Sequence, residues 1–338
     1  MANWFDRYSG PDLVVGMATE TLAVLEQKLG IPAGQPIRMT GWGVGFDVAY
    51  LNVNEDPSLS ASCIQLMSLK ALARDEPHND DGRAVRNMLL AYVTSQRMDR
   101  PIVTHVQALS APTQTEVDAI IELLRSRGVP HLTRINNVYI GLIEDDSGRL
   151  HYDPSVDAGM LLEFAPTYSE AYPNFFAPPR LPENPETIEV PRGTLIRPTS
   201  RTQLVASADA VIERFRAMLD WPEDGHLEVR EGDGYRSVSI VPMNGLSAVW
   251  ELIEPTNSDS RPAKVMERYG PGPWTIRLGV YCIEEKLEDL DRRGTRWEWI
   301  DDGPKGRRVA LNRWDLRGVP IELEELPVVY RGVGGGRT

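Results

Sequence analysis

Two ionisable residues lie inside apolar runs of this 338-residue sequence. His105 is in IVTHVQAL, which begins at Ile102, and Glu163 is in GMLLEFAPT, which ends at Thr167. Short apolar runs of this kind are typical of buried strands, so we expect both side chains to leave water. A buried polar group needs a partner. A metal ion bound to both residues would satisfy them together, whereas the alternative for His105 is a hydrogen-bonded core histidine.

The elements that position these two residues form a pattern. The run TEVDAIIELLRSRG between them has an apolar face and predicts a helix that is capped by Thr115, with Asp118 three residues on, and ends at Gly128. Strand-like runs follow it up to Glu163. The same order of strand, helix and further strands recurs along the chain, at about 12–69, 102–167, 202–255 and 276–326. A self-similar period of this size indicates tandem modules.

This order resembles the βαβββ module of the vicinal oxygen chelate superfamily, in which two modules pair to form a cup. The stretch ELIEPTNSDSRPAKVMERYGPGPWTIRLGV is also similar to part of methylmalonyl-CoA epimerases. The resemblance implies an α+β fold with four βαβββ modules paired into two glyoxalase-like cup-shaped domains. We expect these domains at 1–168 and 201–330, joined by a proline-rich linker at 169–200 and followed by a disordered tail at 331–338.

The resemblance also implies where a metal would bind, because the family takes its ligands from the first and last strands of each module. In the first half the ligand positions fall on Val14, Gln65, His105 and Glu163. Valine cannot coordinate a cation, so the implied metal ligands are Gln65, His105 and Glu163. Such a set suits Mn²⁺, Fe²⁺, Co²⁺, Ni²⁺ or Zn²⁺.

In the second half the corresponding positions have lost both histidines. They fall on Thr202, Glu251, Thr275 and Glu322. Threonine hydroxyls are poor ligands for a first-row divalent metal, so we expect a metal-free cup. Its two glutamates are expected to pair with an arginine such as Arg277 or Arg313.

Four residues are candidates for acid–base chemistry. Glu163 is the first of them, and His151 and Tyr152 lie in the segment before its strand, from which they could overhang the mouth of the cup. Asp47 falls near the place where epimerases of the family have a catalytic carboxylate. Solvated loop residues are the simpler interpretation of His151, Tyr152 and Asp47.

The function that this resemblance favours is a metal-dependent epimerase, isomerase or lyase that acts on a small oxygenated carbonyl substrate through an enediolate. One alternative is a metal-free binding or resistance protein, whose cups hold an aromatic or glycopeptide ligand between hydrophobic walls. A further alternative is an extradiol-type ring-cleaving dioxygenase. Thr202 and Thr275 count against that alternative, because that family holds its iron in the second half.

Composition limits the partners. The net charge is −13, from 49 acidic and 36 basic side chains, and no basic stripe occurs. We therefore expect a small-molecule substrate, no nucleic acid and no membrane partner, and a homodimer is possible. No apolar run is long enough to span a bilayer and the first residues do not resemble a signal peptide, which predicts a cytoplasmic protein.

Overall fold

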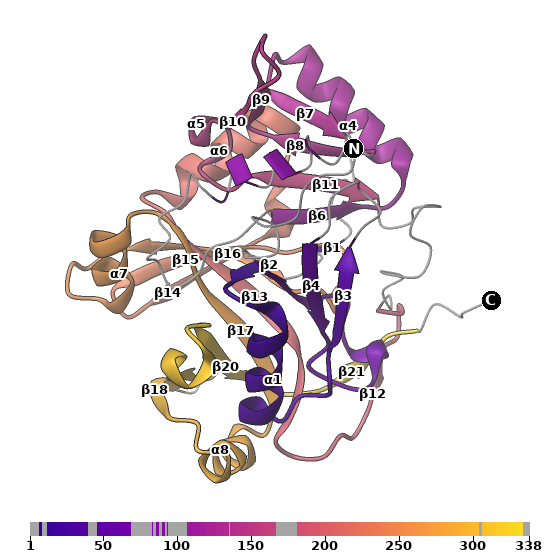
Figure 1. Ribbon diagram of the computed structural model, residues 1–338. Helices are drawn as coiled ribbons and strands as arrows, with labels where there is room; N and C mark the ends of the chain where they lie inside the picture. The colour runs from indigo at the N-terminus through magenta and orange to yellow at the C-terminus, as the bar shows by residue number, and fades with distance from the viewer. Residues whose placement is uncertain are drawn as a thin grey trace.

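The computed structural model describes residues 7–8, 12–39, 46–68, 107–134, 136–166, 181–303 and 306–333, with isolated residues between 83 and 93. These residues form a mixed α+β protein (Figure 1). His105 lies outside the described residues. In the described residues, a strand followed by a helix and by three strands of the same sheet occurs four times, and each occurrence is called a unit below. The second occurrence also contains a hairpin and a short helix.

Unit one is a four-stranded sheet in the order β2-β5-β4-β3. Its elements are β2 (Asp12–Val15), α1 (Ala18–Leu29), β3 (Gln35–Met39), β4 (Phe46–Leu51) and β5 (Ile64–Ser68). The prediction had not included β3, because QPIRM has little β-branched content. Gly30 ends α1 with φ 66°, and its N–H donates to the Glu26 carbonyl.

Unit two contributes to a five-stranded sheet in the order β1-β6-β11-β8-β7. A separate hairpin, β9-β10, and a short helix precede β11. The elements are β1 (Arg7–Tyr8), β6 (Gln107–Ala111), α4 (Gln114–Ser126), β7 (His131–Arg134), β8 (Asn137–Ile140), β9 (Leu142–Glu144), β10 (Leu150–Tyr152), α5 (Pro154–Asp157) and β11 (Leu162–Pro166).

The predicted cap of α4 was wrong by two residues. Thr113 is the N-cap residue, with extended backbone angles, and its hydroxyl donates to Glu116. Thr115 is already inside the helix. The segment PTQTEVD offers a threonine three residues before an acid at two overlapping places, so spacing alone did not distinguish them. Gly128 follows α4 with φ 65°, as expected of a residue at a helix end.

Units three and four share one eight-stranded sheet in the order β14-β15-β16-β13-β17-β20-β19-β18. The antiparallel pair of β13 and β17 joins the two units. The elements are β13 (Thr194–Leu204), α6 (Ala208–Leu219), β14 (Leu227–Gly232), β15 (Tyr235–Ile240), β16 (Val249–Pro255), α7 (Arg261–Tyr269), β17 (Gly272–Tyr281), α8 (Ile283–Arg292), β18 (Trp297–Gly303), β19 (Gly306–Leu311) and β20 (Ile321–Glu325).

Ordered strands occur at both ends of the second half. β12 (Glu186–Thr187) and the first seven residues of β13 fall inside the range expected for the linker. β12 pairs with β21 (Tyr330–Arg331), and the Gly332 N–H donates to the Ser58 carbonyl. The described chain is therefore held beyond position 331, inside the range expected for the tail. No helix in the described residues is long and apolar enough to cross a membrane.

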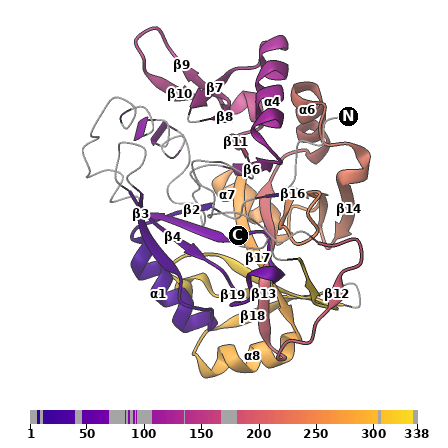
Figure 2. The ribbon, with the colours of Figure 1, turned by 90° about the vertical axis from the view of Figure 1, so that its right-hand side faces the viewer.

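Two large hydrophobic clusters lie on the helix-bearing faces of the sheets, and each joins one unit from the first half to one from the second. The first cluster combines α4 and the strands of unit two with α6 and the strands of unit three. Figures 1 and 2 show α4 and α6 side by side. The second cluster combines α1 and its sheet with α8 and the strands of unit four.

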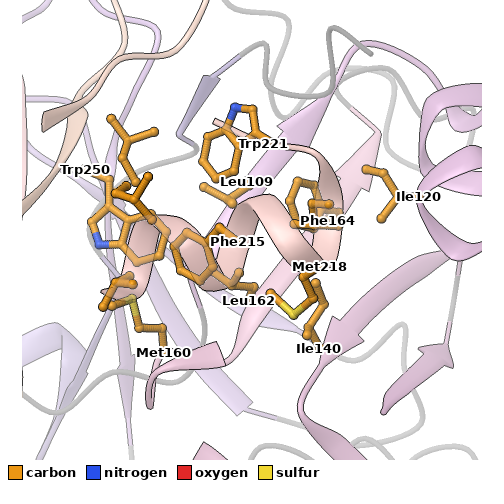
Figure 3. Packing of buried hydrophobic residues seen from close by; sticks show 14 of the residues in the cluster. Leu109, Ile120, Ile140, Met160, Leu162, Phe164, Phe215, Met218, Trp221 and Trp250 are labelled. Atoms are coloured by element: carbon orange, nitrogen blue, oxygen red, sulfur yellow. The ribbon is translucent and has the colours of Figure 1, made fainter. Parts of the chain in front are cut away.

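Phe215 of α6 is at the centre of the first cluster (Figure 3). Its ring centroid lies 6.2 Å from that of Trp221 and 5.5 Å from that of Trp250, with stacked orientations. Leu162 and Phe164 of β11 belong to the same cluster. The strand that carries Glu163 is therefore fixed by residues of the second half.

Candidate functional site

The first candidate site lies on strand faces that point away from the helices. Side chains alternate along a strand, so Leu13, which belongs to the second cluster, faces α1 and its neighbour Asp12 faces the other way. Gln65 stands between two residues of the same cluster, and Glu163 stands between Leu162 and Phe164 of the first cluster. We call Asp12, Gln65 and Glu163 the first site.

The register of unit one places Asp12, and not Val14, beside Gln65. β2 and β5 are parallel, and Asp12 is the Cα partner of Gln65, whereas Val14 is the partner of Met67. The Gln65 amide Nε2 donates to the Tyr50 hydroxyl at 3.1 Å, which orients the amide group. The carboxylate of Asp12 thus stands beside Gln65, where the resemblance implies Val14.

The negative charge of Glu163 acts on Asp12 although the two residues come from different sheets. Asp12 is 3% exposed, and burial raises its pKa well above the usual value. The Arg201 guanidinium opposes this shift, whereas the negative charge of Glu163 adds to it. Arg201 is on β13 and is fully buried. A residue from the second half therefore reaches the first site.

Glu163 is held by two neighbours in unit two. Burial raises its pKa, and hydrogen bonds from Tyr139 and Asn137 lower it. The Asn137 Nδ2 donates to Oε1 of Glu163 at 2.8 Å. These bonds fix the orientation of the carboxylate, as is usual for the groups that surround metal ligands.

The first site fits a divalent cation by its chemistry. Oδ2 of Asp12 is buried and has no hydrogen-bond partner among the described residues, which is costly for a carboxylate unless another group neutralises it. Two carboxylates and an amide oxygen are ligands that divalent metals accept. No group of three His, Cys, Asp or Glu side chains that could hold a metal occurs in the described part of the chain. In the first site the third ligand for a metal would be the amide oxygen of Gln65, which is none of these four residue types.

The other predicted catalytic residues lie elsewhere. Tyr152 is in β10, where its hydroxyl donates to Asp157 and accepts the N–H of Leu161 at 2.9 Å. His151 is exposed on the same strand. Asp47 is in β4, and its side chain is outside the described part of the structure. Tyr152 therefore fixes the turn that leads into β11.

Asp157, which sequence reasoning missed, stabilises that turn. It is completely buried, and its carboxylate accepts the N–H groups of Met160 at 3.2 Å and Leu162 at 3.0 Å. Burial raises the pKa of Asp157 to about 7, although the hydrogen bond from Tyr152 and those from backbone N–H groups lower it.

This buried carboxyl should make stability fall as the pH rises. Because the folded-state pKa is above the unfolded one, the folded protein holds the Asp157 proton more tightly, and its contribution is lost between about pH 4 and pH 7. The slope is at most roughly 1.4 kcal/mol per pH unit. Urea unfolding between pH 5 and pH 8 should show a smaller decline in Asp157→Asn than in wild type.

A neighbouring aspartate provides the control. Asp153 caps α5 by accepting the Ser155 N–H, and this hydrogen bond, with one from the Ser155 side chain, lowers its pKa. Asp153→Asn should therefore keep the wild-type decline. An unchanged decline in Asp157→Asn would show that Asp157 does not titrate in this range.

A second site occupies the matching faces of units three and four. It comprises Thr202, Glu251, Thr275, Arg277 and Glu322, all of which are at most 5% exposed. Arg277 Nη1 lies 2.8 Å from Oε2 of Glu251, and its Nε lies 3.7 Å from Oε2 of Glu322. The predicted pairing of both glutamates with Arg277 is confirmed. Arg313 instead lies over the Trp314 ring.

Sequence reasoning missed three residues in and near the first site, namely Asp12, Asp157 and Arg201. Asp12 begins its strand, whereas Val14 is at the centre of DLVV. The alternation from Leu13 places both Asp12 and Val14 on the inner face, and this is the signal that points to Asp12. Asp157 lies in HYDPSVDAGM, whose proline and glycine predict a loop. Arg201 lies in a different half of the chain, and no local pattern indicates its contact with Asp12.

Comparisons with known proteins identify the fold. No protein-family model and no curated protein matches the sequence. A triple mutant of 4-hydroxymandelate synthase from Streptomyces coelicolor is similar over 98% of this chain and 94% of its own, with 14% identity and a TM-score of 0.53.

Two epimerases match a smaller part of the chain. A variant of methylmalonyl-CoA epimerase from Streptomyces coelicolor covers 40% of this chain and 98% of its own, with 26% identity and a TM-score of 0.34. The Mycobacterium tuberculosis epimerase covers 41% and 92%, with 23% identity and a TM-score of 0.35.

The near full-length likeness to the synthase shows that the two proteins share a fold. The likeness supports the mixed α+β fold that the resemblance implies, and it concerns the fold alone. The neighbours named above are an epimerase and a synthase.

Proposed function

We propose that the first site binds a divalent metal ion and that the protein is an epimerase or isomerase of a small oxygenated carbonyl compound. The observation that carries this proposal is the buried Oδ2 of Asp12, which has no hydrogen-bond partner among the described residues although Asp12 lies within electrostatic reach of Glu163. A cation is the group that satisfies two neighbouring buried carboxylates at once.

The residues that would hold the cation come from both units of the first half. They are Asp12, Gln65 and Glu163, together with His105 from the sequence prediction. When bound, a cation such as Mn²⁺, Fe²⁺, Co²⁺, Ni²⁺ or Zn²⁺ acts as a Lewis acid toward neighbouring substrate oxygens. Hydrogen bonds from Tyr139 and Asn137 keep the Glu163 carboxylate in one orientation.

Arg201 adds a second source of positive charge. Its guanidinium lowers the pKa of Asp12, so the positive charge of Arg201 acts at the first site. Removal of a proton next to a carbonyl leaves negative charge on the carbonyl oxygen, and a fixed guanidinium stabilises such charge in a buried site. Glu163, the first candidate for acid–base chemistry, is the proposed acceptor of that proton. Tyr152 is proposed to position β11, because its hydroxyl bonds Asp157 and Leu161.

The dioxygenase alternative is disfavoured by the second site. That chemistry was expected to need iron in the second half, where Arg277 stands between Glu251 and Glu322 and two threonines occupy the remaining positions. A metal-free binding protein remains the alternative for the first site.

Elemental analysis of protein purified without a nickel column tests the proposal. Near-stoichiometric metal is expected in wild type and should disappear in Glu163→Gln and in His105→Ala. Glu322→Gln, the same substitution in the second site, is the matched control and should retain the metal. Absence of metal from the wild type, even after incubation with Mn²⁺, Fe²⁺ or Co²⁺, would contradict the proposal and favour the binding protein.

A further inference from the structure

The second site has the same strand register as the first, but different chemistry. In unit three, Thr202 is the parallel partner of Glu251, just as Asp12 is the partner of Gln65 in unit one. In unit four, the parallel partner of Glu322 is Arg277. The fold thus brings a second set of buried polar side chains to the corresponding place, with an arginine among them.

Arg277 carries one positive charge and lies within 4 Å of three carboxylates. Besides Glu251 and Glu322, its Nη1 lies 3.5 Å from Oε2 of Glu324. Although burial lowers the pKa of Arg277, the three carboxylates raise it above its usual value. Arg261 approaches from a more exposed position and donates to Oε1 of Glu322 at 3.0 Å. Arg277 is therefore permanently charged and is the buried cation of this carboxylate cluster.

The same side chains do not fit a metal ion. The Thr202 and Thr275 hydroxyls lie 2.8 Å apart and bond each other, and the Thr275 N–H also donates to the Thr202 hydroxyl. The oxygens that a metal would need are bonded to Arg277 and Arg261. The residues present therefore disagree with the metal that the fold family implies at this position.

We propose that Arg277 is a built-in cation, which takes the electrostatic role of a metal ion in the second site and keeps divalent cations out of it. The guanidinium neutralises Glu251 and Glu322 across β16, β17 and β20, so that this half needs no metal to fold. Removing the guanidinium leaves Glu251 without its cationic partner and leaves Glu322 with Arg261 alone. Such a set should then accept a divalent cation from solution.

Mn²⁺ binding to Arg277→Ala tests this proposal. Electron paramagnetic resonance at 1 mM Mn²⁺ should detect one more bound ion per chain in Arg277→Ala than in wild type. In metal-free buffer the variant should melt roughly 10 °C below wild type, and Mn²⁺ should restore most of that loss. Arg277→Ala/Glu322→Gln, which lacks one carboxylate, should lose the additional ion.

Arg261→Ala is the matched control, because Arg261 pairs with the same glutamate from a side chain that is 41% exposed. It should bind no more Mn²⁺ than wild type. If Arg277→Ala does not fold without metal, its refolding in 1 mM Mn²⁺ is the equivalent test. The double variant Arg277→Ser/Glu324→Gln, which has one carboxylate fewer, is tested in the same way. A folded Arg277→Ala with the wild-type Mn²⁺ content, or failure of both variants to recover with Mn²⁺, would overturn the proposal.

Discussion

Replacing Asp12 with asparagine should change two measured properties in opposite directions. Burial and the charge of Glu163 outweigh the effect of Arg201 and raise the pKa of Asp12, so its ionised form destabilises the metal-free protein. At pH 8 the free energy of unfolding of metal-free Asp12→Asn should rise, on the order of 1 kcal/mol for each unit by which the pKa is raised. The affinity for a divalent cation should fall by at least about 100-fold, because an anionic ligand is lost.

Urea unfolding in a chelating buffer and Mn²⁺ titration measure these two effects separately. Asp224, whose side chain is 94% exposed and pairs with Arg216, provides the control. Asp224→Asn should change neither property by much. If Asp12→Asn lowers the stability of the metal-free protein and leaves Mn²⁺ binding intact, Asp12 serves as a structural partner of Arg201 instead of a metal ligand.

Phe215→Ala should give the largest loss of stability. Phe215 is fully buried between Trp221 and Trp250, and truncation leaves a cavity that its stacked neighbours cannot fill. We expect the free energy of unfolding to fall by about 3–5 kcal/mol. Because this cluster also contains the apolar face of α4, hydrogen exchange should quicken in α4 as well as in α6.

Trp314→Ala is the corresponding aromatic truncation at the surface, where the side chain is 71% exposed. It should change stability by less than about 0.5 kcal/mol. Faster exchange confined to α6 in Phe215→Ala would mean that unit two is stable without the second half.

The sequence indicated much of the fold because its local signals agree with the final structure. The apolar face of TEVDAIIELLRSRG and the position of Gly30 after α1 correctly predicted helices. The neighbours of Glu163 correctly predicted a buried carboxylate. The recurrence of strand, helix and strands also correctly predicted the four units.

What the sequence could not indicate depends on contacts between distant segments. The choice between Asp12 and Val14 is set by the register of β2 against β5, fifty residues away, and one strand contains no information on that register. The approach of Arg201 to Asp12 depends on how the two halves pack. The pairing of Arg277 with Glu251 was predictable only because tandem modules imply equivalent strand positions.

The arrangement of the two hydrophobic clusters has a consequence for synthesis of the chain. A ribosome that has completed α1 and α4 has not yet made α6 or α8, whose apolar residues complete the same clusters. At roughly 5–20 residues per second, α8 emerges on the order of tens of seconds after α1. During that interval the nascent first half lacks the helices and strands that complete its two clusters, so its apolar helix faces remain uncovered until late in translation.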